Sequence, residues 1–193
     1  MDIKIRPANK EDAPFIGRVV AGAIGEELCK ELSPNGDDCD VVLRMFSELA
    51  AREDSQYSYK NALIAENDNF ERVGGIVGYD GADLIELRKR FIDKANEHLG
   101  WNVTYKDAER WEAETNESEF YLDSLFVVPE YRNSGLGSLL IKSMIEKNES
   151  KGKPFGLLCD PDNMNALKLY ERLGFRRDGY NSFCGTRMIH LKF

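Results

Sequence analysis

The segment from Tyr121 to Gly137, YLDSLFVVPEYRNSGLG, constrains the fold of this chain more than any other. Its first half, Tyr121 to Val128, is apolar on both alternating faces, which is typical of a strand buried on both sides. Pro129 ends that run, and from Leu136 onward apolar residues recur at helical spacing. We therefore expect a central strand, a glycine-containing turn and a helix in direct succession.

The start of that helix offers a site for an anion. The N–H groups of a first helical turn have no internal partner and carry a partial positive charge. Gly135 and Gly137 leave the approach open, and Arg132 adds donors that suit a phosphate oxygen. The same glycines would also let the helix pack closely on the strand, and the turn alone does not separate these two interpretations. Two nucleotide motifs are excluded, because Leu140 replaces the third glycine of a dinucleotide fingerprint and Ser138 the lysine of a Walker loop.

A second helix is predicted in the segment from Asn163 to Phe175. Asn163 is a good N-cap, and Gly174 is suited to end the helix as its C-cap. Before it, Phe155 to Cys159 has the pattern of another buried strand. Where two neighbouring strands diverge, a crevice opens, and a ligand whose phosphates rest on one helix can extend into it.

Two motifs mark these two helices. The first is Arg132-Asn-Ser-Gly135-Leu-Gly137, and the second is Asn163-x-x-Ala166-x-x-Leu169-Tyr170-x-x-x-Gly174-Phe175. They resemble the Arg/Gln-x-x-Gly-x-Gly/Ala signature and the C-terminal helix of the GNAT superfamily of N-acetyltransferases. The resemblance covers residues 119–181 and implies binding of acetyl-CoA, with the pyrophosphate on the amides of residues 132–138 and the pantetheine arm beside residues 125–127. The cofactor-binding residues it implies are Leu125, Phe126, Val127, Arg132, Asn133, Ser134, Gly135, Leu136, Gly137, Ser138, Asn163 and Tyr170.

With 193 residues, of which 42% are hydrophobic, the chain is long enough for one domain with its own core. Element order and the resemblance predict an α/β (α+β) fold with a mixed, mostly antiparallel central sheet flanked by helices, in a single domain over residues 1–193. No run approaches the ~18 apolar residues of a membrane span, and the N-terminus has no apolar secretory core, so we expect a cytoplasmic protein. The four cysteines lack metal-binding spacing and are expected to be thiols in a reducing compartment.

The N-terminal half is expected to supply a short strand, two helices and a hairpin. Asn9 caps the first helix, which Ser33 to Gly36 interrupts. Its apolar stripe comprises Ile16, Val20, Ala23, Ile24 and Leu28. The second helix carries Val42, Met45, Phe46 and Leu49. Residues 62–66 and 72–79 form the hairpin, and Gly74, Gly75 and Gly78 in its second strand indicate either a bulge or the close approach of another group.

Residues 81–118 form an insertion before the central strand. Its first half has a helical stripe that ends at Gly100 and comprises Leu84, Leu87, Phe91, Ala95 and Leu99. The second half, residues 101–118, mixes aromatic and acidic residues without a period, and we interpret it as a lid or loop. One interpretation is a solvated acidic loop whose aromatic residues fold onto the core. The other is a lid that selects a cationic amine by charge and cation–π contact.

The charge of the chain limits its partners. Lysine and arginine number 26 and aspartate and glutamate 34, which gives a net charge of −8. This argues against a general nucleic-acid binder, whose affinity comes from cations facing phosphates. The expected partner is an amine, either a small molecule or a peptide, with no nucleic acid and no membrane. A homodimer is left open.

Direct acetyl transfer to an amine needs a base for the ammonium proton, a donor to the oxyanion and an acid for the departing thiolate. Tyr170 matches the position where the family commonly places a tyrosine acid. The alternative is an aromatic residue on the core face of its helix. The position of the glutamate base of some family members falls on Tyr121, which is not a carboxylate.

Strand alternation provides other candidates for the base. It places Glu119, Tyr121, Asp123 and Leu125 on one face of the central strand. Asp123, or Glu119 through a water chain, is therefore the expected base, with Tyr121 beside it, although Asp123 could instead anchor the acceptor's ammonium group. The family's bulge near Leu125 implies a main-chain oxyanion donor there. His98 and His190 are expected to be structural, and no metal is required.

The predicted function is an N-acetyltransferase that moves the acetyl group of acetyl-CoA to a primary amine by direct attack. The alternative is a non-catalytic acyl-CoA-binding regulatory or interaction module, which the missing glutamate permits. A third class, recognition of other nucleotide phosphates, predicts that ATP or NAD competes with acetyl-CoA.

Overall fold

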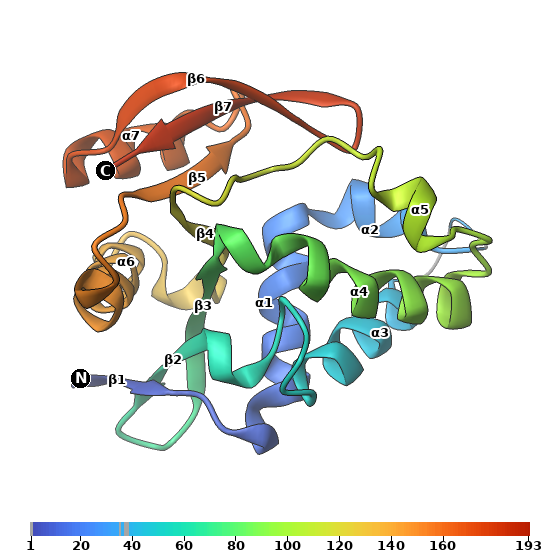
Figure 1. Cartoon of the computed structure of the whole chain (residues 1–193). Coiled ribbons are helices and arrows are strands. Elements are labelled where there is room, and N and C mark those ends of the chain that lie inside the picture. The colour runs from blue at the N-terminus through green and yellow to red at the C-terminus, as the bar shows by residue number, and fades with distance from the viewer. Residues whose placement is uncertain (1, 35, 37–38) are drawn as a thin grey trace.

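Seven strands form one sheet in the computed structural model, which describes residues 2–34, 36 and 39–193. The strands lie in the order β1-β2-β3-β4-β5-β7-β6, and every neighbouring pair is antiparallel except β4 and β5 (Figure 1). Their bounds are β1 Ile3–Pro7, β2 Ala62–Asn67, β3 Arg72–Asp80, β4 Phe120–Val127, β5 Phe155–Cys159, β6 Arg176–Phe183 and β7 Thr186–Lys192. The prediction of a mixed, mostly antiparallel sheet is confirmed.

Helices cover both faces of the sheet. Their bounds are α1 Ala13–Ile24, α2 Glu26–Leu32, α3 Asp40–Ala50, α4 Leu84–Leu99, α5 Tyr105–Ala108, α6 Leu136–Asn148 and α7 Met164–Leu173. Buried residues of α1, α3 and α4 form one core with β2 and β3, and α6 and α7 form a second core on the opposite face (Figure 1). Among the described helices, none has the length and hydropathy that crossing a membrane requires.

The central position of β4 follows from its sequence, as predicted. Its residues are apolar on both faces, and it lies fourth of seven in the sheet, between the two cores. Its parallel pairing with β5 is limited to Phe120 with Phe155 and Tyr121 with Gly156. Beyond Tyr121 the two strands diverge, which opens the crevice that the strand and helix order predicts.

The first predicted helix is in fact two helices. Gly25, with a φ of +87°, ends α1, and Leu28 belongs to α2. Ala23 of the predicted stripe is exposed, while Phe15 and Val19 are buried in the core instead. Of the break predicted at residues 33–36, Asn35 lies outside the described residues. The second helix is confirmed, because its four predicted core residues are all buried in α3.

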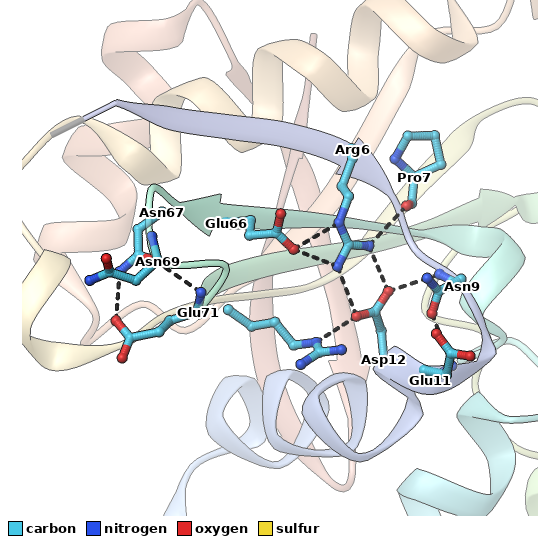
Figure 2. Close-up of polar contacts among 10 residues, drawn as sticks. Arg6, Pro7, Asn9, Glu11, Asp12, Glu66, Asn67, Asn69 and Glu71 are labelled. Atoms are coloured by element: carbon cyan, nitrogen blue, oxygen red, sulfur yellow. Dashed lines mark hydrogen bonds and ion pairs between the residues drawn. The ribbon is translucent and has the colours of Figure 1, made fainter.

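A buried charge network fixes the N-terminal strand to the start of α1 (Figure 2). The Asp12 carboxylate is fully buried and accepts hydrogen bonds from both terminal nitrogens of Arg6, at 2.7 and 3.0 Å, and from Arg72 Nε. Arg6 also donates to Glu66 on β2. Burial alone would raise the pKa of Asp12, but the bonds from Arg6, Asn9 and Arg72 outweigh it and lower the pKa to about 2.

The glycines of β3 serve both of the purposes that the sequence left open. A Cβ atom on Gly75 would overlap Val19 of α1, so this helix lies directly on the strand. The register between β3 and β4 shifts between Val77 and Gly78, and a Cβ on Gly78 would overlap the main chain of Tyr121. One glycine permits close packing, and the other accompanies a bulge.

The insertion begins with a helix, as predicted, and its second half contains the short helix α5 before an irregular segment. Gly100, in a left-handed conformation, ends α4. Residues 109–119 then run from α5 to β4, beneath the β6–β7 hairpin and above α4 in the view of Figure 1. Within this segment Glu114 and Thr115 are buried, so it is more than the solvated loop of the first interpretation. The β6–β7 hairpin had no counterpart among the predicted elements.

Candidate active site

The turn before α6 has the backbone conformation that an anion cradle needs. Gly135 is the N-cap of α6 with a φ of +88°, and Asn133 also has a positive φ of 61°. When left-handed residues alternate with right-handed ones, successive N–H groups turn toward a common point. Gly135 is not required for lack of space, because a Cβ there would meet nothing within 4 Å. It is required by its backbone conformation, because a residue with a side chain is strained at this φ.

Arg132 lies at the mouth of this turn and is exposed. Its Nε donates to the main-chain oxygen of Val127 at 3.1 Å, and its guanidinium lies 5.8 Å from the ring centre of Phe126. Ser134 Oγ donates to the main-chain oxygen of Tyr131. These contacts hold the end of β4 against the turn.

A narrow cavity follows the divergence of β4 and β5. It is lined by Ile76, Leu122, Asp123, Ser124, Leu125, Ile141, Leu157, Leu158 and Tyr170. Leu125 and Val127 pack on the α6 side of the sheet, whereas Phe126 lies on the opposite side, against Gly22 of α1. The predicted pantetheine residues therefore divide between the two faces, and two of the three face the α6 side.

The α7 motif brings Tyr170 to the wall of this cavity. Asn163 is the N-cap, because its side-chain oxygen accepts from the N–H of Ala166 at 3.1 Å. Tyr170 is half-buried, and its ring packs edge-on against Phe175 with centres 5.9 Å apart. Burial, and then the nearby Cys159, raise the pKa of Tyr170 above its ordinary value. Its hydroxyl therefore stays protonated at neutral pH.

A β-bulge in β4 changes which residues share a face. Val77 pairs with Ser124 and Gly78 with Leu122, which leaves Asp123 as the extra residue. Tyr121 consequently packs with Tyr79, while Leu125 joins the core on the α6 side. The prediction that Tyr121 and Leu125 share a face is wrong, because an extra residue reverses the alternation. The irregularity lies at Asp123, two residues before Leu125.

Asp123 has lost most of its contact with bulk water. Its Oδ2 accepts from the Tyr79 hydroxyl at 3.1 Å and its Oδ1 from the Ser124 hydroxyl at 2.6 Å. Burial raises the pKa of Asp123 despite these two hydrogen bonds. Tyr121 is buried with its ring 5.7 Å from that of Tyr79, and burial raises the pKa of Tyr121 well above its usual value. Tyr121 therefore does not ionise near neutral pH.

The sequence did not single out Glu114 as a candidate site residue. It comes from the irregular segment, is 8% exposed, and its Oε1 lies 3.5 Å from the Tyr79 hydroxyl and 3.6 Å from Arg88 Nη2. Burial, and then the charge of Asp123, raise the pKa of Glu114 to about 7, although Arg88 opposes the shift. No periodicity marks this position, so the only sequence signal was the acidic character of the segment.

Glu119, the other candidate base, has a different environment. It is fully buried, and its carboxylate accepts from Thr115 Oγ1 at 2.6 Å and lies 3.1 and 3.2 Å from His190 Nε2. Burial would raise the pKa of Glu119, but these two partners lower it. A Cβ on Gly156 would overlap this carboxylate. Glu119 thus joins the end of the irregular segment to β5 and β7.

A larger cavity, of about 330 Å³, lies on the other side of Glu114. Helices α1 to α4, the irregular segment and the β6–β7 turn all contribute to its wall. Its aromatic residues are Phe46, Tyr57, Phe91, Trp101, Trp111 and Phe183. Glu114 lines this cavity and Asp123 lines the narrow one, and Tyr79 contacts both carboxylates. The two cavities therefore meet at a chain of acidic groups.

Comparison with known proteins identifies the arrangement. Residues 63–175 match the model of the acetyltransferase (GNAT) family. The chain is 31% identical to thialysine N-epsilon-acetyltransferase of Sus scrofa over 76% of its own length and 85% of the relative's. It is 27% identical to spermine/spermidine N(1)-acetyltransferase of Bacillus subtilis over 41% of its own length and 53% of the relative's.

Solved structures agree with these sequence matches. An N-acetyltransferase from Staphylococcus aureus Mu50 superposes with a TM-score of 0.78 at 22% identity, covering 98% of this chain and 100% of the other. A second structure, described as an acetyltransferase, has a TM-score of 0.75 at 27% identity and covers 98% and 97%. This chain belongs to the GNAT family and is an acetyl-CoA-dependent N-acetyltransferase.

Proposed function

We propose that this chain, as a single domain over residues 1–193, transfers the acetyl group of acetyl-CoA directly to a primary amine of a small molecule. One observation carries the proposal: the crevice between β4 and β5 meets the Asp123–Tyr79–Glu114 chain, with Tyr170 on its wall. A route for the cosubstrate and a proton acceptor for the amine thus converge at one place.

The chain's own residues fit acetyl-CoA. The amides of residues 132–138 would hold the pyrophosphate, because the left-handed residues Asn133 and Gly135 gather N–H groups at the start of α6. The slot beside Leu125 would take the pantetheine arm, and the N–H groups at the Asp123 bulge are candidates for the oxyanion donor. When bound, acetyl-CoA supplies the activated acetyl group.

Asp123 and Glu114 together form the proposed base. Two carboxylates that contact the same hydroxyl resist carrying two negative charges. Burial raises the pKa of both groups, and the charge of Asp123 raises the pKa of Glu114 further. The pair can therefore accept the proton of the acceptor's ammonium group near neutral pH. Tyr121 supports the pair by packing on Tyr79.

Tyr170 is the proposed donor to the departing sulfur. A phenol is a weaker acid than a thiol, with pKa values of about 10 and 8.5, and burial widens this difference. The hydroxyl therefore acts first as a hydrogen-bond donor to the charge that develops on sulfur, and full proton transfer is uphill.

The relatives support an amine acceptor, because their names specify thialysine in one case and spermine or spermidine in the other. The acidic groups and aromatic walls around Glu114 fit a cationic amine. These features also favour the interpretation of residues 101–118 as a selective lid.

Replacing Tyr170 with Phe tests the proposal. We expect CoA thiol release to slow by roughly 10²- to 10⁴-fold while the Kd of acetyl-CoA stays within a factor of a few. Tyr180→Phe, on an exposed tyrosine of β6, is the matched control and should leave the rate unchanged. Tight acetyl-CoA binding without turnover of any amine by the wild-type protein would instead favour the non-catalytic module.

A further inference from the structure

Two buried polar atoms have no hydrogen-bond partner within the described residues: Arg88 Nη1 and Gln56 Oε1. Arg88 is 5% exposed and Gln56 is 3% exposed. Both residues line the cavity of about 330 Å³ beside Glu114. An unpaired buried polar atom costs free energy, so a cavity with one such donor and one such acceptor is suited to a ligand that supplies both partners.

Arg88 is held in place by its surroundings but is not saturated by them. It lies on the buried face of α4, together with Leu84 and Ile92. Its Nη2 makes only long contacts, at 3.5 Å to the Glu112 main-chain oxygen and 3.6 Å to Glu114 Oε1, and its guanidinium lies 6.0 Å from the Trp111 ring centre. The other terminal nitrogen keeps its full capacity to donate to an anion.

Gln56 belongs to a turn that several hydrogen bonds hold in place. The Asn61 side chain donates to the main-chain oxygens of Ser55 and Gln56, and the Ser58 hydroxyl donates to the main-chain oxygen of Arg52. These bonds fix the turn against the core. The Gln56 side-chain oxygen is therefore presented to the cavity by a rigid support.

The walls of the cavity are preformed and suit a small ligand. Phe91 packs edge-on against Trp101, and Trp101 packs edge-on against Trp111, with ring centres 5.8 and 6.1 Å apart. A volume of about 330 Å³ lies at the lower end of the range for small-molecule sites. An extended peptide would not fit within it.

We propose that this cavity is the acceptor subsite and that it selects an amine which also carries a carboxylate, as in a free amino acid. Arg88 Nη1 donates to the carboxylate, and Gln56 Oε1 accepts from an N–H of the acceptor. The inference rests on the proposed function and deepens it. A polyamine has no anionic group for Arg88 and would bring further positive charge to a buried guanidinium, so it is disfavoured.

Matched pairs of amines test the assignment. Cadaverine is lysine without its carboxylate, and 2-phenylethylamine is phenylalanine without its carboxylate. In whichever pair is turned over faster, kcat/KM for thiol release should favour the amino acid by about 10- to 100-fold, as expected for a hydrogen bond to a charged group. Arg88→Met should abolish that ratio, mainly through KM. Lys89→Met, its exposed-side neighbour on α4, should keep it. Arg88→Lys is the second variant if Arg88→Met does not fold.

Fluorescence provides a readout that does not depend on turnover. The sequence has two tryptophans, and both line this cavity, so intrinsic tryptophan emission reports on its occupancy. Titration with each amine should show the same preference, and Arg88→Met should remove it. Turnover in which diamines equal or exceed amino acids would overturn the inference and leave acetyl transfer standing. Preferential amino-acid binding without turnover of any amine would overturn acetyl transfer and leave the ligand assignment standing.

Discussion

Glu114, the proposed proton acceptor, owes its raised pKa to residues that lie far from it in the sequence. Burial and the charge of Asp123 raise its pKa, and Arg88 limits the rise. The side chain alone would be an ordinary surface carboxylate. Its chemistry arises when α4, β3 and the segment before β4 come together, which explains why a sequence pattern did not single it out.

Replacing Glu114 with Gln should lower kcat/KM by roughly 10²- to 10⁴-fold. A base works in its deprotonated form, and the pKa of Glu114 is raised to about 7, so the wild-type rate should increase as pH rises through neutrality. The variant should lose that part of the pH–rate profile. Glu109→Gln, on an exposed residue of the same segment, is the control. If the rise near neutral pH persists in Glu114→Gln, another group is the base.

At the scale of elements, the start of α6 separates two roles of glycine. Gly135 is required by its left-handed φ, whereas Gly137 is helical, and a Cβ on it would make ordinary contacts with Leu169 at 3.4 Å and Leu125 at 3.8 Å. Gly135 shapes the turn, and Gly137 leaves the first helical turn without a side chain next to the crevice.

We expect Gly135→Ala to lower the free energy of unfolding by about 1–2 kcal/mol and to weaken acetyl-CoA binding. Gly137→Ala should raise the free energy of unfolding by up to about 1 kcal/mol, yet still weaken binding because its methyl group faces the slot. Chemical denaturation and calorimetric titration would measure both effects. Gly152→Ala, at a φ of +67° away from the site, should reproduce only the loss of stability. Equal acetyl-CoA affinity in all three variants would contradict the cradle.

Elements with local signals were predicted well from the sequence. The bounds of β5 and α7 matched. Those of α7 did so because Asn163 and Gly174 are caps whose effect depends on neighbours a few residues away. The break at Gly25 was missed, because the apolar spacing continues across it and only packing decides that Leu28 belongs to another helix. The resemblance implied a bulge near Leu125, and only the pairing with β3 shows that Asp123 is the extra residue.

For the whole molecule, the sequence suggested residues for the proposed cofactor side of the site but did not single out Gln56 or Arg88 for the proposed acceptor side. The cofactor turn is one continuous segment, and so it leaves a motif. The larger cavity is assembled from four helices, an irregular segment and the turn of a hairpin that was not predicted. Two of its polar residues, Gln56 and Arg88, carry no local pattern that distinguishes them from surface residues.

The divergence of β4 and β5 leaves the two halves of the sheet weakly joined. Their pairing rests on two residue pairs, so the sheet is two half-sheets joined at one end, with β1 to β4 on one side and β5 to β7 on the other. A ligand in the gap would connect them and stabilise the folded state, by about 2.7 kcal/mol at a concentration of 100 times its Kd.

Hydrogen exchange should show this directly. Saturating acetyl-CoA should slow amide exchange in residues 122–125 and also in residues 157–159, on both sides of the gap. Protection confined to the start of α6 would argue against a bridging role. If both sides respond, acetyl-CoA holds the two half-sheets together as well as serving as a substrate. The protein is then most open to proteolysis when acetyl-CoA is scarce, and its lifetime follows the supply of the compound that it consumes.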